Sequence, residues 1–73
     1  MNNDELLDVY PAARVALIEA RKALGLKQYE AAAKLDVSWP YYSKIELGMA
    51  TPEPHLADKI EKLTGVNVLE EQR

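Results

Sequence analysis

Residues 28–47 read QYEAAAKLDVSWPYYSKIEL and contain two short segments with helical spacing, separated by three residues. The first segment is rich in alanine, which lets a neighbouring backbone approach closely. The second follows Ser38, a good N-cap residue, and carries Pro40 in its first turn, where the missing N–H costs no hydrogen bond. The stretch therefore predicts helices over residues 28–35 and 39–47, joined by a tight turn.

Further helices are indicated on both sides of this pair. Gly25, Gly48 and Gly65 each follow a stretch with helical apolar spacing, and glycine favours the left-handed conformation that commonly ends a helix. We expect a first helix over residues 11–24 and a last helix from position 52 or 54 to residue 64. Because no stretch alternates with a period of two, the sequence predicts an all-α fold, a compact bundle of four or five short helices.

The apolar residues at helical spacing predict the core. A chain of 73 residues is expected to form one domain of modest stability. We assign residues 1–10 to a short N-terminal extension and residues 11–73 to the domain, with Val68 and Leu69 in one more short turn that offers a dimer contact. The side chains expected to be buried are those of Leu17, Leu24, Leu35, Val37, Ile45, Ile60 and Leu63.

Composition excludes several classes of protein. The chain has no cysteine and one histidine, so we expect no disulfide, no metal and no cofactor, and self-association remains as a supplement to stability. His55 and Asp58 lie three residues apart, but no nucleophile accompanies them, so we expect no enzyme. No apolar run approaches the ~20 residues that span a bilayer, and the N-terminus is acidic, which predicts no membrane partner and a cytoplasmic protein.

The charge is distributed unevenly. The chain has a net charge of −3, which disfavours contact with nucleic acid when taken as a whole. Residues 21–48, however, hold five basic side chains against three acidic ones, a net charge of +2, while the flanking residues 1–20 and 49–73 carry −3 and −2. The basic character is thus concentrated in the segment that contains the helix pair.

Two short helices joined by three residues have the spacing of a helix-turn-helix, in which the turn holds the second helix so that it protrudes into a major groove. The identities of the residues strengthen this interpretation, because residues 14–69, approximately, resemble the lambda-repressor and Cro-like helix-turn-helix family of phage and bacterial regulators. The matching features are Gly25, Leu26, Gln28, Ala32, Leu35, Val37, Ser38, Ser43, Lys44, Ile45, Glu46, Gly48 and the segment TPEPHLADKIEKLTGV at 51–66.

The resemblance implies a sequence-specific DNA-binding regulator with residues 39–47 as the recognition helix. It places Gln28 near phosphate and Arg21 in an ion pair with Glu46 between the first and third helices. Lys44, one turn before the end of the third helix, can reach a guanine edge in the major groove. The residues expected to contact DNA are Lys27, Gln28, Ser38, Trp39, Tyr41, Ser43 and Lys44. For Trp39 two roles stay open, packing on sugar and thymine methyl groups or contact with another protein.

Two functional readings follow from these observations. The first is a regulator that binds a double-stranded DNA operator as a homodimer. The second is a protein-interaction module, or an antitoxin, on the same fold with a protein partner. The chain departs from the family pattern at Asp36, which replaces a glycine, at Trp39 and Pro40, where polar residues are common, and at Met49 and Ala50, where basic residues are common. The second reading is favoured by the acidic balance, the aromatic cluster of Trp39, Pro40 and Tyr41, and the lack of arginine near that helix.

Overall fold

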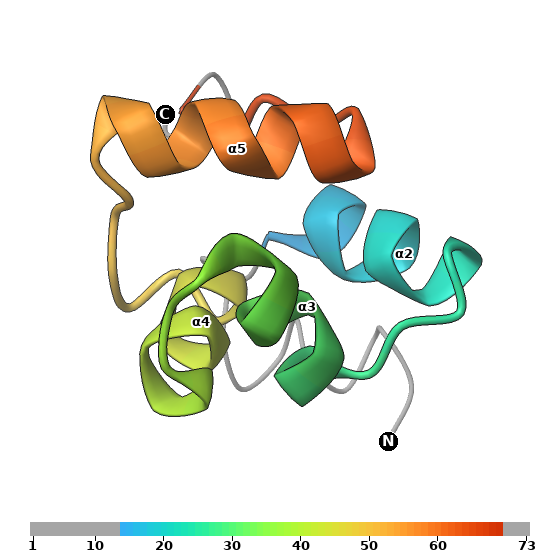
Figure 1. Ribbon diagram of the computed structural model, residues 1–73. Helices are drawn as coiled ribbons and strands as arrows, with labels where there is room; N and C mark the ends of the chain where they lie inside the picture. Colours follow the sequence, from blue (N-terminus) through green and yellow to red (C-terminus); the bar gives the residue numbers. More distant parts are fainter. Residues whose placement is uncertain (1–13, 70–73) are drawn as a thin grey trace.

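The computed structural model of the protein describes residues 14–69, which form helices and connections but no strand (Figure 1). The helices are α2 (Val15–Ala23), α3 (Gln28–Leu35), α4 (Trp39–Glu46) and α5 (Pro54–Thr64). This architecture confirms the predicted all-α fold. The expected N-terminal extension, Pro11 and residues 70–73 lie outside the described residues.

Helix α2 begins later than the sequence predicted. Arg14 has a non-helical backbone, with φ −85° and ψ 80°, so among the described residues the helix starts at Val15. The backbone N–H of Arg14 donates to the carbonyl of Glu46 at 2.8 Å, and its guanidinium donates to the carbonyls of Ile45 and, at 3.0 Å, Ala50. A positive charge is thus placed at the carbonyl end of α4, where the helix dipole favours it.

The expectation that Leu24 is buried is wrong. The residue lies beyond the last residue of α2, and 50% of its surface is exposed. Gly25 follows with φ 75°, so the chain turns away before Leu24 can continue the inward face of the helix. Ile18, one position after Leu17, is buried instead, with 3% exposed.

The turn between α3 and α4 has the length that the sequence predicted. Asp36 adopts the left-handed conformation, with φ 60° and ψ 43°, and its N–H donates to the carbonyl of Ala33 at 3.1 Å. The N–H of Val37 then donates to the carbonyl of Ala32 at 3.0 Å. These bonds satisfy carbonyls at the end of α3, and the next residue, Ser38, already caps α4.

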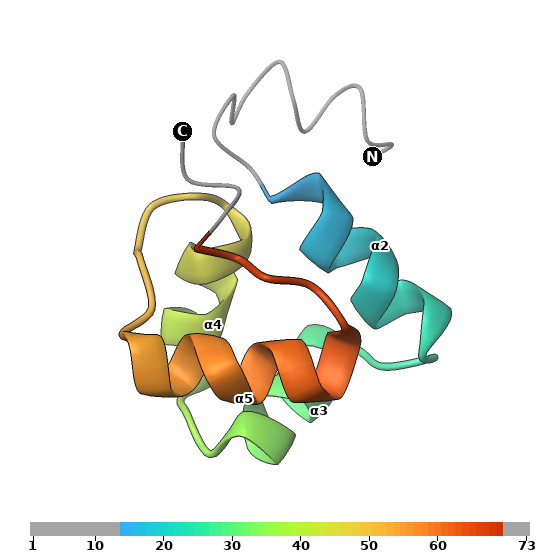
Figure 2. The ribbon, with the colours of Figure 1, turned by 90° about the horizontal axis from the view of Figure 1, so that it is seen from above.

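Helix α5 closes one side of the bundle. It follows Glu53, whose side chain makes no capping hydrogen bond, and carries Pro54 in its first turn. Gly65 ends it with φ 80°, and Figure 2 shows the following residues doubling back along the helix. Val68 on this segment is fully buried, with 0% exposed, so it is not available for the expected dimer contact, whereas Leu69 is 37% exposed.

The core lies where the four described helices meet. Helix α3 packs against α4, and α5 packs against α2 and α3 from the other side (Figure 1). Val37 and Leu63, which were expected to be buried, are half-buried and pack against this core. Its buried residues are Leu17, Ala31, Ala32, Leu35, Tyr42, Ile45, Leu56, Ala57, Ile60 and Val68.

None of the helices in residues 14–69 combines the length and hydropathy that crossing a membrane requires.

Candidate nucleic-acid interface

Helix α4 turns one face inward and leaves the other accessible. The buried face consists of Tyr42, Ile45 and Glu46. Because residues three and four positions apart share a face of a helix, the remaining side chains point elsewhere. In α4 the side chains of Trp39, Pro40 and Lys44 are exposed, and those of Tyr41 and Ser43 are half-buried.

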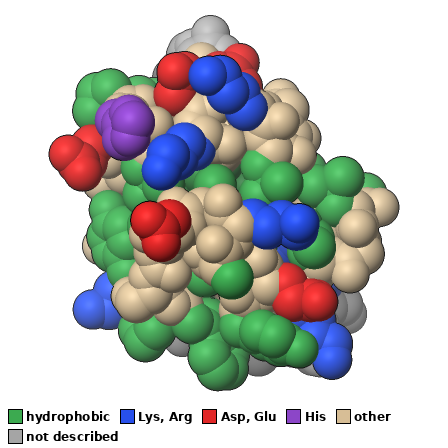
Figure 3. All heavy atoms as spheres, viewed as in Figure 1, with side chains coloured by type: hydrophobic (Ala, Val, Ile, Leu, Met, Phe, Trp, Pro, Cys, Tyr) green, Lys and Arg blue, Asp and Glu red, His purple; other side chains and the backbone are tan. Residues whose placement is uncertain are grey.

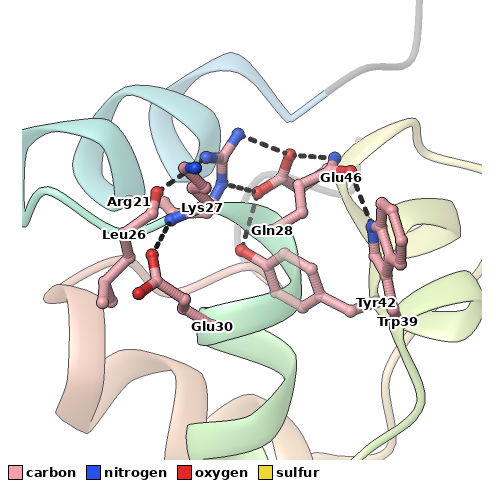
Figure 4. Close-up of polar contacts among 8 residues, drawn as sticks. All are labelled: Arg21, Leu26, Lys27, Gln28, Glu30, Trp39, Tyr42 and Glu46. Atoms are coloured by element: carbon pink, nitrogen blue, oxygen red, sulfur yellow. Dashed lines mark hydrogen bonds and ion pairs between the residues drawn. The ribbon is translucent and has the colours of Figure 1, made fainter.

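The buried carboxylate of Glu46 joins α4 to two other helices. Arg21 of α2 donates to it from Nε at 2.6 Å and from Nη2 at 3.2 Å, an arrangement with two parallel bonds that fixes the guanidinium plane. The hydroxyl of Tyr42 donates to it at 2.7 Å, and Nε2 of Gln28 in α3 donates at 2.8 Å. Figure 4 shows these three side chains converging on Glu46, of which 1% is exposed.

This cluster perturbs the titration of its members. Burial lowers the pKa of Arg21, but the hydrogen bond to Glu46 and the charge of Glu46 outweigh burial and raise it above the ordinary value. Burial is also the largest influence on Tyr42, and it raises the pKa of the phenol together with the hydrogen bond to Glu46. Arg21 is therefore charged and Tyr42 neutral at physiological pH.

A second hydrogen bond extends from the buried cluster to the surface. Nε1 of Trp39 donates to Oε1 of Gln28 at 3.1 Å, so the amide of Gln28 bridges Glu46 and Trp39 (Figure 4). The ring of Trp39 also meets the ring of Tyr29 in an edge-on arrangement, with centroids 6.2 Å apart and an interplanar angle of 62°. The first residues of α3 and α4 are thus tied together.

The other expected contact residues lie in two places, directly before α3 and α4 and further along α4. Lys27 precedes α3 and is exposed, with its backbone N–H donating to Glu30 at 2.8 Å. Ser38 is exposed and its Oγ accepts the N–H of Tyr41 at 3.3 Å, as expected of an N-cap. Lys44 is exposed further along α4, whereas Tyr41 is half-buried and packs partly against the core.

Two residues of the site were missed by the sequence analysis. Tyr42 was not among the residues expected at the site, although its spacing of four residues from Glu46 places both on one helical face and could have indicated their hydrogen bond. The contact of Tyr29 with Trp39 had no local signal, because the two residues lie on different helices.

The surface over α3 and α4 differs from that over α5. Hydrophobic side chains gather at the lower end of the molecule, which α3 and α4 form, and charged side chains gather over α5 (Figures 1 and 3). Among the described residues, Tyr29 is 51% and Trp39 54% exposed. Within residues 14–69 no group of three or more His, Cys, Asp or Glu side chains is placed to hold a metal ion.

The turn between α3 and α4, and the half of α4 that is left accessible, define a helix-turn-helix domain. A family model described as "Helix-turn-helix" matches residues 17–70, most of the chain. The protein therefore belongs to the lambda-repressor and Cro-like helix-turn-helix family, a family of DNA-binding regulators. No curated protein and no solved structure matches the chain significantly.

Proposed function

We propose that the protein is a sequence-specific transcriptional regulator that places α4 in the major groove of a double-stranded DNA operator. The observation that carries the proposal is the division of α4 into a fixed face and a free face. Tyr42, Ile45 and Glu46 anchor the helix in the core, and Glu46 is held from α2 and α3 as well. A helix fixed in this way presents its exposed side chains in one orientation, which direct readout of base edges requires.

The accessible residues divide into base and backbone contacts. Lys44 is long enough to reach the N7 and O6 acceptors of a guanine, the commonest specific partner of a basic side chain, and Tyr41 precedes it by three residues on the same side of α4. Ser43 lies between them. Lys27, Gln28 and Ser38 lie at the first residues of the two helices, where cationic groups and helical N–H groups favour phosphate.

The active form is proposed to be a homodimer on a pseudo-palindromic operator. The chain has a net charge of −3 and few basic side chains near α4, so a single domain neutralises few phosphates. Two linked recognition helices compensate for this weakness. In such a dimer the half-sites lie about 10 base pairs apart, centre to centre.

The proposal is tested by measuring binding to DNA and its dependence on salt. We expect binding to random duplex DNA at low salt that weakens as salt is raised, since phosphate contacts release counterions. Selection from a random duplex pool should then enrich a paired sequence motif. If no duplex is bound at low salt, the proposal is wrong.

A second function, a protein-interaction module or antitoxin, is favoured by one specific observation. The exposed pair of Tyr29 and Trp39, with Pro40 beside it, forms an aromatic surface of the kind enriched in protein interfaces. An antitoxin would combine this contact with binding to its own promoter. The salt series separates a pure interaction module from a DNA-binding regulator, because such a module shows no DNA binding to lose.

A further inference from the structure

Trp39 opens α4 with an exposed ring that has no free hydrogen-bonding group. More than half of the residue, 54%, is exposed. An indole has a single donor, its Nε1–H, and no acceptor. That donor is already bound to Oε1 of Gln28 at 3.1 Å. What Trp39 offers to a ligand is therefore carbon surface alone.

The bond from Gln28 is fixed in direction by the chemistry of its two partners. The carboxylate of Glu46 only accepts hydrogen bonds, and the indole of Trp39 only donates one. The amide of Gln28 satisfies both when Nε2 faces Glu46, at 2.8 Å, and Oε1 faces Trp39. The reverse orientation would pair acceptor with acceptor and donor with donor. Gln28 thus holds the exposed indole from a buried, charged anchor.

Tyr29 supports the indole ring from a second direction. The two rings meet edge to face, a favourable arrangement for aromatic pairs, with centroids 6.2 Å apart. A side chain held at both its N–H and its ring loses less rotamer freedom on binding than a free surface tryptophan. Trp39 is therefore organised before any ligand arrives.

We propose that Trp39 reads the 5-methyl group of a pyrimidine, carried by thymine or by 5-methylcytosine. This inference rests on the proposed function, because α4 must lie in the major groove. The first residues of a recognition helix contact base edges there. The base edges in this groove present nitrogen and oxygen groups and one apolar group, the pyrimidine 5-methyl. A ring without a free donor leaves polar groups unsatisfied when it covers them, whereas it gains contact area from a methyl.

The first test removes the methyl group from DNA. Each thymine of the selected operator is replaced in turn by deoxyuridine, which lacks only this group. At one position in each half-site we expect binding to weaken roughly fourfold, the loss that one buried methyl-sized group produces. A parallel series compares cytosine with 5-methylcytosine at the same position. A response in both series assigns the contact to the methyl group in either base, and a response to thymine alone assigns it to thymine.

The second test removes the Trp39 side chain. Trp39→Ala should bind thymine and deoxyuridine operators equally at the sensitive position. Met49→Ala is the matched control, because Met49 is a large apolar residue that is 64% exposed but follows α4 rather than opening it. This variant should keep the fourfold difference. Thermal melting of both variants shows that each remains folded.

A spectroscopic test uses the unchanged protein. Trp39 is the single tryptophan of the chain, so intrinsic emission reports on this side chain directly. We expect the thymine operator to shift the emission of Trp39, and to protect Trp39 from acrylamide quenching, more than the deoxyuridine operator does. If DNA binds but neither emission nor affinity responds to the methyl group, the inference is overturned and the proposed function stands. If no duplex binds, both are overturned.

Discussion

Glu46 is the residue on which the presentation of α4 depends most. Its carboxylate is buried and accepts hydrogen bonds from Arg21, Gln28 and Tyr42. Its pairing with Arg21 was expected from the family resemblance alone. The bridge through Gln28 to Trp39 could not be expected, because it depends on how closely α3 and α4 approach and not on any local pattern.

Breaking the Arg21 and Glu46 pair should destabilise the fold. Glu46→Gln and Arg21→Met each leave a buried polar partner uncompensated, so we expect each to cost about 3 kcal/mol, more than an exposed pair. Denaturant unfolding of the single and double variants measures the coupling energy. Lys22→Ala, at an exposed neighbouring position, should stay within about 0.5 kcal/mol of the wild type. Strictly additive costs would contradict this prediction.

Tyr42 should make stability depend on pH in the alkaline range. Burial and the hydrogen bond to Glu46 raise its pKa in the folded state above the ordinary value of 10.0. The neutral phenol is therefore favoured by folding, and its contribution is complete below about pH 10 and is lost as pH rises further. Tyr42→Phe should be less stable near neutral pH but should lose stability less steeply above pH 10. Parallel curves for the two proteins would exclude the effect.

Lys44 is the side chain for which base readout is most directly testable. If it reaches a guanine edge, Lys44→Ala should weaken binding to the selected operator by about 1–3 kcal/mol and relax the preference at one base pair. Lys34→Ala, an exposed lysine on α3, should leave that preference in place. Binding to the operator and its single-base variants provides the comparison, and an unchanged preference in Lys44→Ala would count against readout through this residue.

At the scale of elements, the turn and the two helices beside it were the most predictable part of the molecule. Ser38 and Pro40 are local signals, and the bounds of α3 and the start of α4 agree with them. The start of α2 was less predictable, because Arg14 leaves the helical conformation and its side chain and N–H instead bond to carbonyls at and after the end of α4. Such long-range partners leave no trace in helical spacing.

The turn itself stores a small amount of strain that a substitution should release. Asp36 has a positive φ of 60°, which costs a residue with a Cβ more than it costs glycine. We expect Asp36→Gly to raise the free energy of unfolding by up to about 1 kcal/mol. Lys34→Gly, in the body of α3, should lower the free energy of unfolding by about 1 kcal/mol, because glycine is unfavourable inside a helix. Equal effects of both variants in urea unfolding would contradict this account.

At the scale of the whole molecule, the all-α fold followed from the sequence, while part of the surface did not. Leu24 was expected inside and is half exposed, and Val68 was expected at a dimer contact and is fully buried. Both errors have one cause. The helical spacing of apolar residues shows which face of a helix turns inward. It says little about residues just beyond the end of a helix, where the chain changes direction.

A homodimer should form most readily on DNA. Two half-sites on one duplex would hold two subunits at high effective concentration, so we expect weak association of the free protein and a two-to-one complex on the selected operator. Sedimentation with and without the operator measures both states. A duplex with one half-site scrambled should bind a single subunit more weakly, and a one-to-one complex on the intact operator would show that the protein acts as a monomer.

The hydrogen-bonded chain from Arg21 through Glu46 and Gln28 to Trp39 also bears on attempts to reprogram the protein. If α4 is the recognition helix, as proposed above, a library that randomises α4 alone leaves the residues of α3 unchanged. Trp39, the first residue of α4, is oriented by Gln28 of α3. A library confined to residues 39–46 would therefore test each new side chain at position 39 beside a Gln28 that is placed to bond to an indole. Positions 28 and 39 form one unit of variation, and new binding preferences should emerge more often when the two are changed together.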